Sequence, residues 1–215
     1  MDDRVESAAE LEANLRDIEL ANRLFGGIAP LVREVERAAA VSVLDVGCGS
    51  ADIPLALVRN ARRRGVSLRV TCLDRSEQML EIARRRTGAD PGLIFVRGEG
   101  TSLRFPAGAF DVVTCSLALH HFSPDEAVAL LREMRRVARV TPIVCDLRRS
   151  RTAHAATWAL TRAFTRNRLT RHDAPLSVLR AYTPGEAHAL AVRAGWRTPN
   201  VRSERWFRMT LVDER

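Results

Sequence analysis

The stretch VSVLDVGCGSADIP, residues 41–54, joins a β-branched apolar run to a glycine loop and then to the start of a helical pattern. A short apolar run of this composition predicts a β-strand that is buried on both faces. Gly47 and Gly49 let the backbone turn sharply after that strand and approach a ligand closely. The stretch therefore predicts the strand–loop–helix unit that opens an α/β sheet.

The same alternation continues along the chain. Further strands are predicted at LRVTCLD, LIFVRG, FDVVTCSL and TPIVCDL, and the closing stretch WRTPNVRSERWFRMTLV predicts two antiparallel strands. Capping boxes at 123–126 and 183–186 predict the starts of two intervening helices. We therefore predict a Rossmann-like, doubly wound α/β sheet of seven strands, mostly parallel with the last strand antiparallel.

The length of 215 residues suits one domain. We expect an N-terminal helical cap (1–40), a cofactor-binding core (41–147), a helical insertion that forms a lid (148–182), and a C-terminal helix with strands (183–215). Gly26 and Gly27 separate two N-terminal helices. The first helix should carry its apolar side chains on one face: Leu11, Leu15, Ile18 and Leu24.

Composition excludes several classes of protein. The net charge of +8 comes from arginines scattered along the chain without interleaved aromatic residues, so we expect no nucleic-acid partner. The four cysteines form no CxxC pair, and we expect no metal site. The acidic N-terminus is unlike a signal peptide and no apolar run has the length of a membrane span, so we expect a cytoplasmic protein.

Acidic residues stand at the ends of three predicted strands: Asp45, Asp74 and Glu99. In a doubly wound sheet these ends meet at one edge, where ligands bind. Asp45 can accept hydrogen bonds from an ammonium group, directly or through water, or order the loop around it. Asp74 can accept hydrogen bonds from both hydroxyls of a ribose, or it can cap the helix that follows. Glu99 can accept a hydrogen bond from the amino group of an adenine.

A dinucleotide would require a different loop. The GxGxxG pattern needs glycine where this chain has Asp52, and a carboxylate there repels a pyrophosphate. An adenosine joined to an amino acid carries no phosphate and suits the acidic set. Gly98 and Gly100 would let the backbone lie close to the adenine ring.

Four segments resemble class I S-adenosylmethionine-dependent methyltransferases, of the small bacterial kind grouped as type 11/12: VLDVGCGSADIP, VTCLDRSEQML, FVRGEGTSLRFPAGAFDVVTCSLALHHF and LLREMRRVARVTPIVCDLRRS. They cover about residues 41–150 in family order. Ala51 replaces a frequent third glycine, and GEG replaces the commoner Gly-Asp-Ala while it retains the acid.

The resemblance implies S-adenosylmethionine as methyl donor, S-adenosylhomocysteine as product and no metal. It implies that Gly47, Cys48 and Gly49 wrap the methionine part of the cofactor. The backbone of Ser116 or Leu117 would hold the methionine amine.

The resemblance also assigns the adenosine part. Asp74 would hold the ribose, and Glu99 with Gly100 would hold the adenine. Arg75 and Met79 would pack near the adenosine.

A general base can assist methyl transfer to a hydroxyl. His120 and His121 follow the fourth predicted strand and titrate in a suitable range, although they could also pack under the cofactor or cap a helix. His172 with Asp173 is a second candidate, or part of a surface loop. Asp146 ends the fifth strand and could reach the pocket or order a loop.

The acceptor site should lie beneath the predicted lid. Trp158 and other apolar residues of 148–182 would contact an apolar small molecule or simply cover the sheet edge. Arg148 and Arg149 could bind an acidic group of the substrate or be solvated.

We predict O-methylation of a phenolic, polyketide-like or quinone-like compound in secondary metabolism, by a monomer or homodimer. The positive charge also suits an RNA or protein methyltransferase, although SLAL stands where an NPPY-like tetrapeptide would be expected. Two further hypotheses are a non-catalytic S-adenosylmethionine-binding protein and an NAD-dependent oxidoreductase, and Asp52 opposes the second of them.

Overall fold

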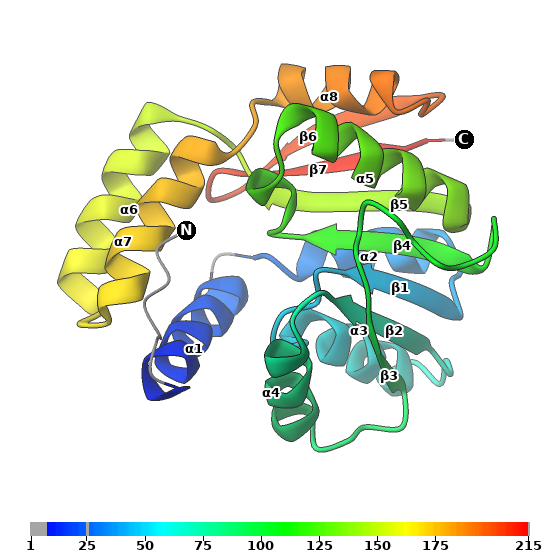
Figure 1. The fold of residues 1–215 in the computed structure, drawn as a ribbon, viewed down its shortest axis with the longest axis horizontal. Coiled ribbons are helices and arrows are strands. Elements are labelled where there is room, and N and C mark those ends of the chain that lie inside the picture. Colours follow the sequence, from blue (N-terminus) through cyan, green and yellow to red (C-terminus); the bar gives the residue numbers. More distant parts are fainter. Residues whose placement is uncertain (1–7, 25, 215) are drawn as a thin grey trace.

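A single mixed sheet runs through the molecule (Figure 1). The computed structural model describes residues 8–24 and 26–214, which contain seven strands in the order β3-β2-β1-β4-β5-β7-β6. Their bounds are β1 Ser42–Val46, β2 Arg69–Asp74, β3 Leu93–Arg97, β4 Phe110–Ser116, β5 Ala138–Leu147, β6 Pro199–Glu204 and β7 Arg208–Asp213. The predicted sheet is confirmed. The antiparallel strand β7 lies between β5 and β6. The edge of the sheet opposite β3 is therefore formed by β6 and not by the last strand of the chain.

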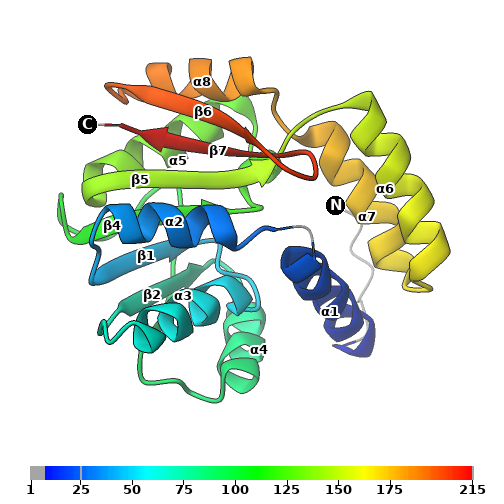
Figure 2. The same ribbon diagram turned by 180° about the vertical axis from the view of Figure 1, so that it is seen from behind.

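Helices cover both faces of this sheet (Figure 2). Their bounds are α1 Ala8–Leu24, α2 Ala29–Arg37, α3 Asp52–Arg63, α4 Glu77–Thr87, the 3₁₀ turn η1 Leu119–His121, α5 Pro124–Val137, α6 Arg151–Phe164, α7 Arg168–Arg180 and α8 Pro184–Arg193. Helices α2, α3 and α4 bury apolar side chains against one face, while η1, α5 and α8 bury theirs against the other. Both predicted capping boxes are present, at α5 and α8.

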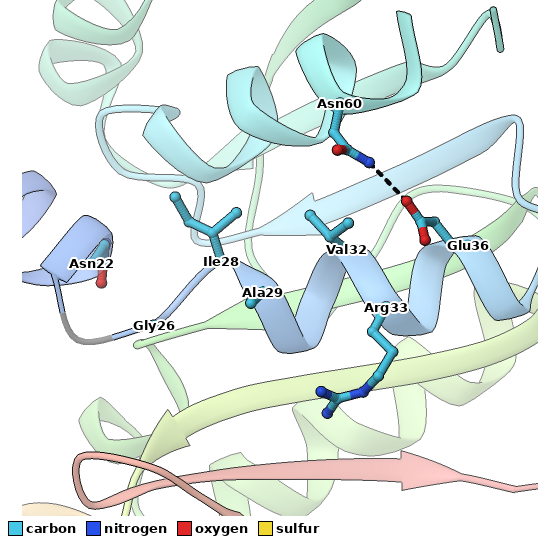
Figure 3. A pocket seen from close by; sticks show the side chains of 8 residues that line it. All are labelled: Asn22, Gly26, Ile28, Ala29, Val32, Arg33, Glu36 and Asn60. Atoms are coloured by element: carbon cyan, nitrogen blue, oxygen red, sulfur yellow. Dashed lines mark hydrogen bonds between the residues drawn. The ribbon is translucent and has the colours of Figure 1, made fainter. Parts of the chain in front are cut away.

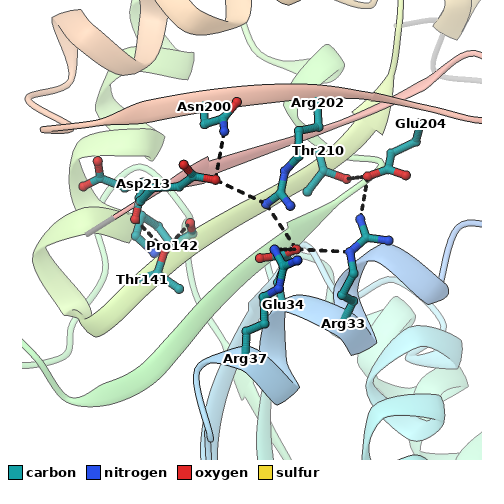
Figure 4. Close-up of polar contacts among 11 residues, drawn as sticks. Arg33, Glu34, Arg37, Thr141, Pro142, Asn200, Arg202, Glu204, Thr210 and Asp213 are labelled. Carbon is teal, nitrogen blue, oxygen red and sulfur yellow. Dashed lines mark hydrogen bonds and ion pairs between the residues drawn. The ribbon is translucent and has the colours of Figure 1, made fainter.

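Helix α2 is fixed to the β6–β7 hairpin by ion pairs (Figure 4). The buried carboxylate of Glu34 pairs with Arg202 of β6 at 3.1 Å and with Arg37 at 3.3 Å. Arg33 reaches Glu204 at 2.8 Å. Leu31 is fully buried against the sheet, so α2 belongs to the layer that covers the core.

Helix α1 lies apart from α2, near the α6–α7 hairpin and α4 (Figure 1). Asp17 accepts hydrogen bonds from the hydroxyls of Thr165 and Thr170, each at 2.7 Å, which ties α1 to α7. Leu15 is buried as predicted, whereas Ile18 is 39% exposed, so the predicted apolar face is not continuous. The side chains of Leu11 and Leu24 lie outside the described residues.

Candidate functional site

The glycine loop follows β1 and is anchored to the end of β2. The backbone N–H groups of Gly47 and Cys48 both donate to the carbonyl of Leu73, at 2.8 and 3.0 Å. Gly47 has a φ of +74°, and a Cβ there would lie 3.1 Å from the Cβ of Ala118. Both the backbone conformation and the close contact therefore disfavour a side chain at this position. Cys48 is buried, and the neighbouring Cys72 thiol, together with burial, raises the pKa of Cys48.

Asp74 connects this loop to the next helix. Its Oδ2 accepts from the N–H of Gly49 at 3.1 Å, and its Oδ1 accepts from the N–H of Ser76 at 2.9 Å. Ser76 itself caps α4, since its hydroxyl accepts from the N–H of Met79. Because each carboxylate oxygen has two lone pairs, Asp74 retains acceptor capacity for a further donor.

The third acidic position follows β3. The N–H of Gly98 donates to the carbonyl of Asp74 at 3.0 Å, which brings Glu99 to the same edge of the sheet, where its side chain is exposed. A Cβ on Gly100 would lie 2.7 Å from Cγ1 of Val46, so only glycine fits there without displacement. Arg75 is exposed and Met79 half-buried at the start of α4, beside Asp74 in the chain.

Asp45 lies below this rim. It is 2% exposed, and the hydroxyl of Thr114 on β4 donates to its Oδ1 at 2.6 Å. Burial raises the pKa of Asp45 to about 7, against the effect of the Thr114 hydrogen bond, and the charges of Asp52 and Asp74 raise it further. At neutral pH this carboxyl is therefore divided between its protonated and charged forms.

The end of β4 presents two unusual backbone and side-chain features. The buried hydroxyl of Ser116 has no hydrogen-bond partner among the residues that the structure describes. Leu117 has a φ of +52°, a conformation that side chains rarely adopt, while its N–H donates to the carbonyl of Cys145 at 2.9 Å. A polar ligand group here would satisfy the Ser116 hydroxyl.

His120 forms a buried pair with Asp146. The two residues are 5% and 1% exposed, and His120 Nδ1 lies 2.7 Å from Asp146 Oδ1. The backbone N–H of His120 donates to the other oxygen at 3.1 Å. With Asp146 charged, Nδ1 carries the hydrogen, and Nε2 is the acceptor whenever the ring is neutral.

His121 differs from its neighbour. It is exposed, and its ring centroid lies 4.2 Å from that of His120. Partial burial of the ring, followed by the effect of His120, lowers the pKa of His121, so its neutral form is favoured.

The residues predicted for the acceptor lie on separate elements. His172 is on helix α7 rather than in a loop, with its side chain 74% exposed and 2.9 Å from Asp173. Trp158 is exposed on α6, where the guanidinium of Arg162 lies 4.0 Å from its ring centroid. Arg148 donates to Ser203 Oγ at 3.3 Å. No hydrogen bond, ion pair or ring contact within 8–24 and 26–214 joins these three to His120.

Sequence reasoning missed a buried arginine that extends toward the glycine loop. Arg208 of β7 is 4% exposed, and its Nη2 donates to Asn22 Oδ1 at 3.0 Å. Asn22 in turn donates to Asp52 Oδ2 at 3.1 Å, and Asp52 accepts from Ser50 at 3.4 Å. Burial lowers the pKa of Arg208. The chain has 34 arginines, so nothing in the sequence distinguishes this one.

Two hollows border that network. The first, of about 420 Å³, is lined by Asn22, Gly26, Ile28, Ala29, Val32, Arg33, Glu36 and Asn60 (Figure 3). It lies mainly between α2 and α3. The second, of about 480 Å³, is lined by residues of α1, α3 and α4 together with Ser50. Helix α1 thus borders the far side of the glycine loop.

Residues 43–141 match the family model of the methyltransferase domain. This region therefore has the sequence pattern of a class I methyltransferase domain. The resemblance predicted from the sequence is confirmed. The match includes Asp45, Asp74, Glu99 and His120, and excludes Arg208.

Curated relatives of the methyltransferase domain are named demethylmenaquinone methyltransferase. The protein of Staphylococcus epidermidis is 37% identical over 107 residues, which make up 50% of this chain and 42% of the relative. That of Staphylococcus haemolyticus is 40% identical over 96 residues, or 45% and 38% of the two chains. The aligned part thus spans less than half the length of these relatives.

Solved structures share the fold of the methyltransferase domain and its surrounding helices. A putative O-methyltransferase from Nostoc punctiforme superposes with a TM-score of 0.68 at 17% identity, over 98% of this chain and 61% of the other. Human N-acetylserotonin methyltransferase, in complex with S-adenosylmethionine, gives a TM-score of 0.69 at 12% identity, over 98% and 56%.

Proposed function

We propose that this chain transfers a methyl group from S-adenosylmethionine to a small-molecule acceptor. The observation that carries the proposal is the contact between Asp74 and the N–H of Gly49, at 3.1 Å. It places a carboxylate, which suits ribose hydroxyls, directly beside a loop whose own Asp52 disfavours a diphosphate. The unpartnered, buried hydroxyl of Ser116 supports a polar ligand group at the neighbouring strand end.

When bound, the cofactor supplies a sulfonium methyl that is already activated for transfer. Asp74 binds the ribose, and Glu99 with Gly100 contacts the adenine. Arg75 and Met79 flank the adenosine.

The methionine part lies against the glycine loop in this proposal. Gly47, Cys48 and Gly49 follow its chain, and Ser116 and Leu117 meet its amine. Their common position at the ends of β1 and β4 supports this arrangement.

Asp45 should couple cofactor binding to the release of a proton. Its pKa of about 7 leaves the carboxyl largely protonated below that pH, where it offers no charge to an ammonium group. An ammonium favours the charged form, so the affinity for S-adenosylhomocysteine should rise as the pH increases through 7. Calorimetry in buffers of different ionisation enthalpy detects the proton released on binding, because the observed binding enthalpy then changes with the buffer. Asp45→Asn should abolish its release, and equal release by this variant would contradict the coupling.

We propose that Arg208 binds the carboxylate of the methionine part; its buried guanidinium and its link through Asn22 to Asp52 support this role. Arg208→Gln should weaken S-adenosylhomocysteine binding by about tenfold, because a charge-assisted hydrogen bond is lost. Binding of 5′-methylthioadenosine, which lacks the amino-acid part, should not change. Arg202→Gln, which removes an arginine paired with Glu34, is the matched control for calorimetry. An equal loss for both ligands would exclude a specific carboxylate contact.

His120 is the proposed general base. Asp146 holds the imidazole through Nδ1, which leaves Nε2 to accept the proton of an acceptor hydroxyl. His121 lies beside His120, and we expect it to contribute less to the proton transfer. This role requires an acceptor with a hydroxyl group, whatever the rest of that molecule.

A phenolic or quinone-like acceptor, methylated on oxygen, is the finer proposal. The names of the staphylococcal relatives support a quinone-like ring, over the part of the chain that aligns with them. Secondary metabolism, a cytoplasmic location, a monomer or homodimer and the lid role of 148–182 belong to the same proposal.

The decisive experiment combines binding with turnover. Calorimetry should show binding of S-adenosylmethionine and S-adenosylhomocysteine but not of NAD, and mass spectrometry should show methylated product from hydroquinones or phenols. Binding of NAD alone would contradict the proposal. Cofactor binding with no product from any acceptor would favour a non-catalytic binding protein, and methylation of RNA or protein would favour a macromolecular acceptor.

A further inference from the structure

Helix α6 exposes an unusually apolar surface to solvent. Phe164 is 84% exposed, Trp158 49% and Leu160 43%. Between and around them Ala155, Ala159 and Ala163 are also exposed. Ala153 is the buried residue of this helix, so α6 contributes almost nothing to the core of the domain. We call Trp158, Leu160, Phe164 and these three alanines the α6 surface.

Positive charge surrounds the α6 surface. Residues 148–172 contain seven arginines and no aspartate or glutamate: Arg148, Arg149, Arg151, Arg162, Arg166, Arg168 and Arg171. In the described part of the chain, Arg149 is the one of them that forms an ion pair, with Glu186. The remaining charges have no carboxylate at ion-pair distance there. Exposed apolar side chains flanked by uncompensated arginines are typical of a helix that lies on an anionic membrane.

We propose that the α6 surface docks the protein on an anionic lipid bilayer. Trp158 and Phe164 would insert among the lipid headgroups, while the arginines at both ends of α6 contact the acidic ones. The proposed binding is peripheral. Within 8–24 and 26–214, no helix is long and apolar enough to cross a membrane.

A second copy of the chain is a poorer occupant of the same surface. Two such surfaces face to face would bring together two arginine sets without an acidic residue between them, and like charges repel. An anionic bilayer instead complements the charge along the whole segment.

A lipid-bound position also bears on the acceptor. If the acceptor is quinone-like, as proposed above, it partitions into lipid, and docking through α6 brings the site to the membrane that holds it. The membrane proposal does not depend on that acceptor, because it concerns a surface separate from the cofactor residues.

Flotation of the full chain with vesicles tests the proposal. Vesicles of phosphatidylcholine mixed with phosphatidylglycerol should bind at least about tenfold more protein than phosphatidylcholine alone, and salt should weaken this binding. Trp158→Ser with Phe164→Ser should lower binding about tenfold or more, since both apolar anchors are lost. Arg162→Gln with Arg166→Gln should lower it as well.

Matched controls separate the α6 surface from general charge and hydrophobicity. Val192→Ser removes an apolar side chain, 53% exposed, from helix α8. Arg59→Gln with Arg63→Gln removes two exposed charges from α3. Both controls should bind vesicles as the parent does, and circular dichroism confirms that all variants are folded.

Three results would overturn the proposal. The first is no binding to the anionic vesicles at low salt. The second is a loss in the controls that equals the loss in the α6 variants. The third is a surface that instead binds RNA or a second copy, detected as α6-dependent RNA binding or dimerisation without vesicle binding. Cofactor and acceptor are absent from this assay, so its failure is distinct from a failure of the proposed methyl transfer.

Discussion

Asp74→Ala should weaken the binding of S-adenosylmethionine and S-adenosylhomocysteine by about 1–3 kcal/mol, or about 5- to 150-fold. The substitution removes the proposed acceptor for the ribose hydroxyls. It also releases the N–H groups of Gly49 and Ser76, which the carboxylate holds at 3.1 and 2.9 Å. Calorimetry measures the affinity directly, and thermal unfolding reports any loss of stability separately.

Two further variants sharpen this experiment. Asp74→Asn keeps one acceptor oxygen and removes the charge, so its affinity should fall between those of the parent and the alanine variant. Asp90→Ala is a matched control, because Asp90 also accepts from a backbone N–H, that of Gly92 at 2.9 Å, outside the glycine loop. It should leave cofactor affinity unchanged. Unchanged affinity in both Asp74 variants would remove the ribose role.

Substitution of His120 should have the largest effect on turnover. At saturating cofactor, His120→Ala should lower kcat by about 10²–10⁴-fold, the usual contribution of a general base. Asp146→Asn should lower kcat too and shift its pH profile, because an amide cannot hold the same imidazole tautomer. A coupled assay over a range of pH measures both effects.

Controls separate chemistry from folding here. His120→Gln retains a polar side chain in the buried position and serves where the alanine variant loses stability. His121→Ala should have the smaller effect, and His188→Ala, on the exposed face of α8, should have none. Intact turnover in both the His120 and His121 variants would make the imidazoles structural.

The parts of this fold that follow local rules were predictable. The glycine loop was expected from Gly47 and Gly49, and both have a positive φ. The strands follow from apolar runs, and the helix starts at Ser123 and Thr183 follow from side chains three residues apart. Each of these signals lies within a few neighbouring residues, so it can be recognised in the sequence without knowledge of the tertiary contacts.

Other features depend on residues that are distant in the chain. The burial of Asp45 depends on Thr114 of the adjacent strand, 69 positions away. Asp146 lies 26 positions from His120, and Arg208 lies 186 positions from Asn22. Strand pairing and helix packing determine these contacts, and neither spacing nor composition reveals them. The exposure of Trp158 is of the same kind, because it depends on how α6 lies relative to α7.

The position of β7 has a consequence for synthesis on the ribosome. Because it pairs with β5 along 143–147, that edge of β5 has no partner until β7 itself has emerged. A chain truncated before Arg208 would therefore leave β5 as an open edge of the unfinished sheet, prone to aggregation. The same truncation would remove the arginine that reaches Asn22, so a nascent chain gains its edge protection and its complete Arg208–Asn22 network together, when β7 is added.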